Sequence, residues 1–310
     1  MNIWKKITYL EAPDILNQLF LISLSVIIIV NYKLISAWYI IVIINLVLGT
    51  GIVYVVSLYE SMSEYDKSKN SLWKILRYWY PCFMILFCFK IIYIIMYNIE
   101  KVIYDNILIY LDYKIFGFNP TEAVFGLSNP VLTEILQIIY ILFYIMPLIF
   151  GIEIFLKKRY NDFKYLMFVL FLGFYLSFFG YLILPAIGPR FTLHDFHLLN
   201  NDLPGVFLTN VLRDIINFGE SIPKYVPDPE EFAQRDAFPS GHSIIILLIV
   251  YLSRKFKCKS FRFYLPYAAL MLFSTIYLRY HYVVDVIAGF IIAILTVLMS
   301  ELIYKTKKSD

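Results

Sequence analysis

Charged residues are scarce in this chain. Lys, Arg, Asp and Glu make up 16% of its 310 residues, whereas hydrophobic residues make up 60%. An average soluble domain carries about 25% charged residues, and the apolar residues here fall in long runs rather than in amphipathic stripes. The composition therefore excludes a typical soluble protein and indicates an integral membrane protein.

Cysteine is also rare, with Cys82, Cys88 and Cys258 as the three examples. Their spacing matches no metal-binding pattern, and two of them lie inside one apolar run. We therefore expect neither a disulfide framework nor a cysteine metal site.

The long apolar runs predict an all-α polytopic protein with about eight transmembrane helices. Two of the runs are shorter than the roughly 20 residues that a crossing usually needs, so we expect polar residues beside them at membrane depth. The runs cover residues 15–31, 34–58, 75–98, 131–157, 165–185, 240–253, 264–279 and 283–304.

The distribution of basic residues predicts the orientation. With both termini in the cytoplasm, 18 of the 27 Lys and Arg fall on the cytoplasmic side, including Lys5, Lys6, Lys307 and Lys308. This bias follows the positive-inside rule and accounts for the net charge of +4 without a nucleic-acid partner.

We expect two parts: an N-terminal pair of transmembrane helices in residues 1–74, and a six-helix core in residues 75–310. Within the core, the segment 99–130 predicts a helix lying flat in the membrane interface. Its polar face holds Asp105, Asp112 and Lys114, and its apolar face holds Ile103, Ile107, Leu108, Leu111 and Ile115.

The outer loop 186–239 is about fifty residues long and contains several Pro and Gly. Its length favours a lid or a substrate-binding role, with a plain linker as the alternative.

Three polar clusters stand at the outer ends of consecutive spans. "LPAIGPRF" leaves Arg190 at the mouth of a helix, "FPSGHS" begins a helix at Ser240, and "YLRYHYVVD" spaces His281 and Asp285 four residues apart. A spacing of four places two side chains on one helical face. We therefore expect these clusters to meet at the outer membrane face.

Together the clusters suit an oxyanion. The start of a helix at Ser240 and Gly241 offers free N–H groups to a phosphate, and Arg190 offers a charged fork to its oxygens. Asp285 could hold one ring proton of His281 and leave the other nitrogen free to attack phosphorus. His242 could then protonate the leaving oxygen.

These residues resemble the type-2 phosphatidic acid phosphatase superfamily, whose pattern is K-x6-R-P, then P-S-G-H, then S-R-x5-H-x3-D. The second motif is complete here from Pro239 to His242, and the third keeps His281-x3-Asp285. The resemblance covers residues 75–304. It implies a phosphohistidine on His281, acid catalysis by His242, phosphate binding without metal or other cofactor, and a membrane lipid phosphate as substrate.

The chain departs from the pattern at its basic positions. Ile183 stands where the first motif has Lys, Phe191 follows Arg190 in place of Pro, and Thr275 replaces the Arg of the third motif. Arg279 or Arg235 could support Arg190. The string "STIYLRYHYVVD" is similar to the third motif of the inositol phosphorylceramide synthase branch, which implies transfer of a headgroup between lipids as an alternative to hydrolysis.

Other polar residues are candidates for contacts with a lipid headgroup. Glu134, Gln137, Tyr140 and Tyr144 follow one another at helical spacing, and we expect Tyr144 to lie deepest in a cavity, with interfacial anchoring as the alternative.

In the outer loop, Asp236 lies beside Arg235, and both could complete the basic shell or brace the loop. His194 and Asp195 are expected to contact a headgroup or order the loop rather than to bind a metal.

The sequence thus predicts a lipid phosphatase or phosphotransferase with its site outside the cytoplasm. Water or a lipid alcohol would accept the phosphoryl group. A non-catalytic transporter or scaffold on the same fold is the rival from another class.

Overall fold

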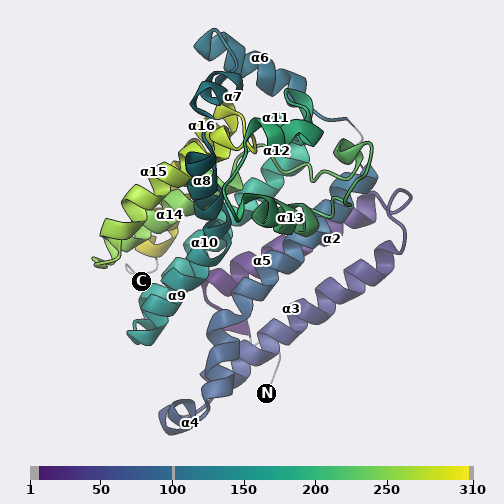
Figure 1. Cartoon of the computed structure of the whole chain (residues 1–310). Helices are drawn as coiled ribbons and strands as arrows, with labels where there is room; N and C mark the ends of the chain where they lie inside the picture. The colour runs from purple at the N-terminus through teal and green to yellow at the C-terminus, as the bar shows by residue number, and fades with distance from the viewer. Residues whose placement is uncertain (1–6, 100–101, 307–310) are drawn as a thin grey trace. The chain divides into compact units, whose positions relative to one another are not determined.

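The structure is a computed structural model that describes residues 7–99 and 102–306 (Figure 1). These residues form helices and turns, with no strand among them, so the prediction of an all-α chain is confirmed. Lys5, Lys6, Lys307 and Lys308, which entered the prediction of orientation, lie outside the described residues. The α-helices are α2 (Ala12–Val30), α3 (Trp38–Glu60), α4 (Glu64–Lys69), α5 (Ser71–Ile99), α6 (Asp105–Phe116), α7 (Pro120–Ala123), α8 (Pro130–Leu142), α9 (Met146–Leu156), α10 (Tyr160–Ile183), α11 (Pro189–Thr192), α12 (Leu199–Asp202), α13 (Thr209–Gly219), α14 (Gly241–Lys255), α15 (Phe261–Tyr277) and α16 (Val283–Thr306).

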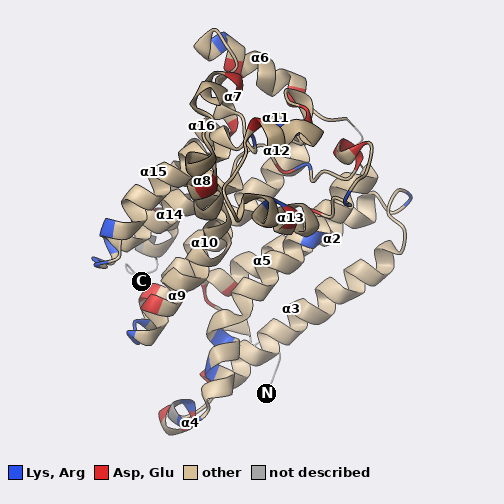
Figure 2. Ribbon diagram, in the orientation of Figure 1, with Lys and Arg blue, Asp and Glu red and all other residues tan. Residues whose placement is uncertain are grey.

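Six helical segments are long and apolar enough to cross a membrane: α2, α3, α5, α8 with α9, α10 and α16. Figure 2 shows charged residues mainly near helix ends and in loops, with long uncharged stretches between them. The chain is therefore a multi-pass membrane protein. The helices α14 and α15 have 15 and 17 residues, so the count of eight spans stays a prediction.

The chain divides into two compact units. The first comprises residues 1–101 and 154–175, and the second comprises residues 102–153 and 176–310. The first unit thus groups α5 and part of α10 with the two N-terminal helices. The predicted boundary at residue 74 stays a prediction.

A buried ionic cluster holds the first unit together. Arg77 of α5 donates two hydrogen bonds of 3.0 Å to the carboxylate of Asp14 on α2, and its Nε lies 3.1 Å from Glu60 of α3. Tyr80 donates a further hydrogen bond of 2.5 Å to Asp14. Because Arg77 and Asp14 are both buried, each needs the other to offset its desolvation.

Replacing Arg77 with alanine is expected to destabilise the protein by about 3–5 kcal/mol, because Asp14 would remain buried without its cation. Thermal unfolding of the purified protein in detergent would measure the loss. Arg159→Ala is the matched control, since Arg159 pairs with Asp162 at a half-exposed site and such pairs contribute about 0–1 kcal/mol. Equal shifts for the two variants would contradict this account.

The second unit is built around α14, α15 and α16, which pack side by side, with α8 against α15 and α13 against α8 (Figure 1). Gly289 of α16 faces the start of α14, where an added Cβ would lie 2.8 Å from the carbonyl oxygen of Ser240. Only a residue without a side chain permits this approach, and it brings the first turn of α14 against α16.

The amphipathic segment after residue 99 forms α6, and one residue of its predicted apolar face lies apart from the others. Asp105 and Asp112 are buried against the protein, whereas Ile107 and Ile115 are 47% and 55% exposed. Leu108, predicted on the same face as these isoleucines, is buried in the core. The predicted position of α6 in the membrane interface stays a prediction.

The two aspartates of α6 bind main-chain groups beside the predicted motifs. Asp105 accepts hydrogen bonds from the N–H groups of Ile187 and Gly188, at 3.0 and 2.8 Å. Asp112 accepts from the N–H groups of Val283 and Val284, both at 2.9 Å. The bonds of Asp112 satisfy free amides at the start of α16. Those of Asp105 hold the segment just before Arg190.

The outer loop 186–239 is not structureless, because it contains α11, α12 and α13. Gly188 has φ +93°, and an added Cβ there would lie 2.8 Å from the carbonyl oxygen of Tyr280. Ala237 N–H donates a 3.0 Å hydrogen bond to the carbonyl of Ala186. The two ends of the loop therefore meet beside the segment that carries His281.

Candidate active site

The two histidines expected to share the chemistry are in direct contact. His242 lies in the first turn of α14, and His281 lies in the turn between α15 and α16. His242 Nδ1 is 3.1 Å from His281 Nε2. The structure therefore brings together two residues that are 39 positions apart in the sequence.

The partners of His281 determine its tautomer. Its Nδ1 lies 2.9 Å from the carbonyl oxygen of Ala237 and 3.4 Å from Oδ2 of Asp285. A carbonyl oxygen can only accept, so Nδ1 carries the proton and Nε2 of the neutral ring holds a lone pair. His242 Nδ1–H then donates to that lone pair. The sequence indicated Asp285 as the partner but not the closer Ala237 carbonyl, a main-chain group that no residue type reveals.

Asp285 also joins the second motif to the third. Its Oδ2 accepts a hydrogen bond of 2.9 Å from Tyr282 N–H, and its carbonyl oxygen accepts one of 3.1 Å from Ser240 N–H. Ser240 Oγ caps α14 by accepting from Ser243 N–H at 3.2 Å. The main-chain N–H and the hydroxyl of Ser240 therefore both form hydrogen bonds within the protein in this structure.

Gly241 is the first residue of α14, and an added Cβ at this position would collide with the hydroxyl of Tyr181. The backbone therefore has no room for a side chain here. The roles of Ser240 and Gly241 in binding a phosphate stay predictions.

Arg190, the predicted phosphate ligand, is buried and already paired. Its guanidinium forms an ion pair with Glu220, and its NH1 lies 3.4 Å from Oδ1 of Asn217. The guanidinium also lies 4.7 Å from the ring centre of Tyr280 and 4.6 Å from that of Phe191. Glu220 was not predictable as a partner of Arg190, because nothing in its local sequence relates it to that residue.

Burial keeps the ring of His281 neutral at physiological pH, against the effect of the nearby carboxylates on its pKa. Burial lowers the pKa of His281 to about 4, although the nearby carboxylate of Asp236 favours the protonated ring. Burial, together with the charge of Glu220, raises the pKa of Asp236 to about 6. A neutral His281 is the state in which Nε2 can act as a nucleophile.

Arg279 points into a different cluster from Arg190. Its NH1 donates a hydrogen bond of 2.7 Å to Asp202, and its guanidinium lies 5.2 Å from the ring centre of Phe125. Arg279 itself has φ +65°. Arg235 is half-buried beside Asp236. The support that either arginine gives to Arg190 stays a prediction.

The histidines of the outer loop contact other parts of the chain. His194 Nε2 lies 3.1 Å from the hydroxyl of Thr121, and burial lowers the pKa of His194 to about 4. Asp195 accepts a hydrogen bond of 2.8 Å from His197 N–H, and His197 Nε2 lies 3.0 Å from the carbonyl of Pro227. The roles of His194 and Asp195, in ordering the loop or in contacting a headgroup, stay predictions.

The polar residues of α8 divide into two groups. Glu134 accepts hydrogen bonds from four N–H groups at the start of α13, those of residues 206 to 209. It therefore caps α13 instead of facing a headgroup cavity. Gln137 is fully buried, and its side chain interacts with that of Tyr280.

Aromatic rings of α8 and the following turn surround His242. The ring centres of Tyr140 and Phe143 lie 4.9 and 4.5 Å from that of His242, and Tyr140 stacks on Tyr280 at 4.1 Å. Tyr144, expected to lie deepest, is 51% exposed, with its ring centre 5.9 Å from that of His242. Gln137 and Tyr140 are thus the buried members of this stripe.

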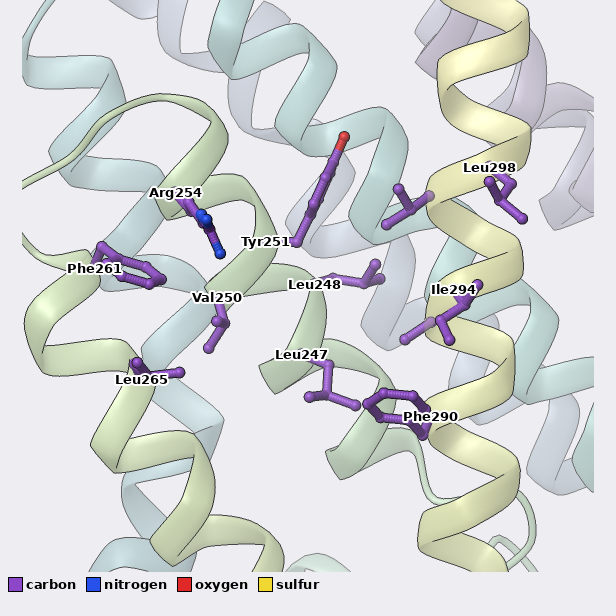
Figure 3. A pocket seen from close by; sticks show the side chains of 12 residues that line it. Leu247, Leu248, Val250, Tyr251, Arg254, Phe261, Leu265, Phe290, Ile294 and Leu298 are labelled. Atoms are coloured by element: carbon purple, nitrogen blue, oxygen red, sulfur yellow. The ribbon is translucent and has the colours of Figure 1, made fainter.

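An apolar pocket of about 420 Å³ lies between α14, α15 and α16 (Figure 3). It begins at Leu247, five residues beyond His242 and so roughly 7 Å further along the helix. Leu265, Phe290 and Ile294 contribute to its wall. Most of its lining is apolar, and Tyr251 and Arg254 are the polar residues in it.

Comparison with known proteins places the chain in a family. A family model described as the PAP2 superfamily matches residues 106–299, which include both histidines, Asp285 and Arg190. No curated protein and no solved structure matches the chain. Because the match covers more than half of the sequence and the two histidines it includes meet in the fold, the chain belongs to the PAP2 superfamily of phosphatase-type membrane enzymes.

Proposed function

We propose that the chain cleaves or transfers a phosphate ester of a membrane lipid through a phosphohistidine on His281, without a metal ion, at the extracytoplasmic face. The observation that carries the proposal is the pairing of His281 with His242. Nδ1–H of His281 is held by Ala237 and Asp285, so its Nε2 lone pair is aimed at the ring of the second histidine.

In the first step, the lone pair of His281 Nε2 attacks phosphorus, and the bond from phosphorus to the leaving oxygen breaks. His242, protonated on both nitrogens while the anionic substrate is bound, gives its Nδ1 proton to that oxygen. The imidazole of His281 becomes positively charged as the new bond forms. Asp285, 3.4 Å from Nδ1, stabilises this charge.

In the second step, water or a lipid alcohol attacks the phosphohistidine. His242 Nδ1 takes the proton of the attacking hydroxyl, and the electron pair of the broken N–P bond returns to His281 Nε2. The contact of 3.1 Å between the rings leaves no space for phosphorus, so substrate must separate them.

Headgroup transfer is the second candidate within the same chemistry. Thr275 stands where the third motif has arginine, and this replacement is similar to the inositol phosphorylceramide synthase branch. The nearby Arg279 pairs with Asp202. The two reactions share the phosphohistidine and differ in the acceptor.

A product assay on cells that express the chain tests both reaction and sidedness. Short-chain lipid phosphates are added outside intact cells, together with a lipid alcohol. We expect either free phosphate or a phosphorylated lipid alcohol to form, and the ratio of the two identifies the reaction. Products that form only after permeabilisation would contradict the extracytoplasmic site. The absence of both products from intact and permeabilised cells would contradict the enzyme and favour a transporter or scaffold.

A further inference from the structure

We propose that Glu220 determines which anions the site accepts, by competing with the substrate phosphate for Arg190. Glu220 belongs to none of the three motifs and follows α13 in the outer loop. This inference rests on the proposed function, because it concerns the same phosphate site. In this role Glu220 selects against dianionic phosphates.

The position of Glu220 is fixed by the anchoring of α13. At the start of the helix, Glu134 binds its free amides, including Thr209 N–H at 3.1 Å. In the middle, Arg213 donates hydrogen bonds of 2.8 Å to Asn200 Oδ1 and to the carbonyl of Leu203. At its end, Glu220 pairs with Arg190. The carboxylate is therefore presented by a docked helix and not by a free loop.

The carboxylate of Glu220 binds the guanidinium of Arg190, the group that a phosphate would need. A guanidinium presents the same fork of N–H donors to a carboxylate and to a phosphoryl group. The side chain of Arg190 is 5% exposed, and rings of Phe191 and Tyr280 lie close to its guanidinium. The N–H groups that Glu220 binds are therefore open to a phosphate only when Glu220 leaves them.

The charge balance explains why dianions are disfavoured. Glu220, Asp236 and Arg190 all act on the charge of His281, and Asp285 lies 3.4 Å from its Nδ1. The nucleophile therefore lies among three carboxylates and one guanidinium, which sum to −2 when all are ionised. Each further negative charge on the substrate adds repulsion in a buried site where Coulomb interactions are strong. A monoanionic phosphodiester is therefore favoured over a dianionic monoester.

Glu220→Gln tests the proposal, because glutamine keeps the size of the side chain and removes its charge. In purified protein we expect inorganic phosphate to inhibit this variant at a concentration about tenfold lower than that needed for the wild type, because the charged group that competes for Arg190 has been removed. The ratio of kcat/KM for a monoester lipid to that for a diester lipid should rise by a similar factor. The change should lie in KM, with kcat nearly constant.

Asp214→Asn is the matched control, since Asp214 lies on the same helix and pairs with Lys224 at an exposed site. It should leave both quantities unchanged. If Glu220→Gln does not fold, Glu220→Asp, whose shorter side chain reaches Arg190 less well, should show an intermediate shift in the same direction. Folded Glu220 variants with wild-type inhibition and an unchanged substrate ratio would overturn the proposal.

A binding measurement separates this inference from the proposed function. Inorganic phosphate should raise the unfolding temperature of Glu220→Gln more than that of the wild type, even if neither cleaves a lipid. Absence of lipid turnover would then count against the proposed function alone. An equal thermal response in the two proteins would count against the role of Glu220.

Discussion

Replacing His281 with glutamine is expected to lower turnover of lipid phosphates by roughly 10⁴-fold or more, the scale seen when a nucleophile is removed from a unit that acts together. The variant loses the lone pair that forms the covalent bond to phosphorus. It keeps an amide that can reach the carbonyl of Ala237, so the fold should persist. Turnover and trapping of labelled phosphoenzyme in acid-quenched and alkali-quenched samples would measure the effect.

A phosphohistidine is labile in acid and stable in alkali, so label that survives only the alkaline quench identifies the intermediate in the wild type. His197→Gln is the matched control, because His197 lies in the outer loop with its ring on the carbonyl of Pro227. The control should keep both turnover and label. Normal turnover or normal label in His281→Gln would remove His281 from the mechanism.

Replacing His242 with glutamine is expected to slow the same reaction by roughly 10²- to 10⁴-fold, the range for loss of a general acid. The nucleophile remains, so the defect should depend on the leaving group. A nitrophenyl phosphate ester needs little protonation of its leaving oxygen, and its first step should be nearly as fast in the variant as in the wild type. Burst kinetics with this ester and steady-state kinetics with a lipid phosphate would measure the contrast.

The two histidine variants therefore have different signatures. His242→Gln should still form phosphoenzyme from the activated ester, and should accumulate it because the second step also lacks its base. His281→Gln should form none from any substrate. An equal loss with activated and lipid esters in His242→Gln would show that His242 positions the substrate and does not act as the acid.

Much of the fold was predictable from local patterns. A long apolar run has one low-energy solution in a bilayer, a helix that satisfies its own hydrogen bonds, and α2, α3, α5, α10 and α16 follow the predicted runs. The faces of α6 were predicted less well. Periodicity shows that Asp105 and Asp112 share a side of the helix, but the amides that bind them come from residues up to 172 positions away.

The candidate site shows the same division. Its proline, serine, glycine and histidine are contiguous, and His281 and Asp285 are four residues apart, so both patterns are legible in the sequence, although α16 begins only at Val283, after His281. The pairing of Arg190 with Glu220 spans 30 residues and joins α11 to the end of α13, and no periodicity relates residues of two separate elements. Arg279 was a candidate through its closeness in sequence to His281, yet its side chain binds Asp202.

The sequence by itself determined the membrane class, the long apolar helices and the identities of the two histidines, because each follows from composition or from spacing within one element. Only the tertiary structure decided that the histidines touch, that a main-chain carbonyl holds the proton of His281, and that a carboxylate occupies Arg190. These contacts join segments that are tens of residues apart. Their geometry depends on how α13, α14 and α16 pack, which no local pattern encodes.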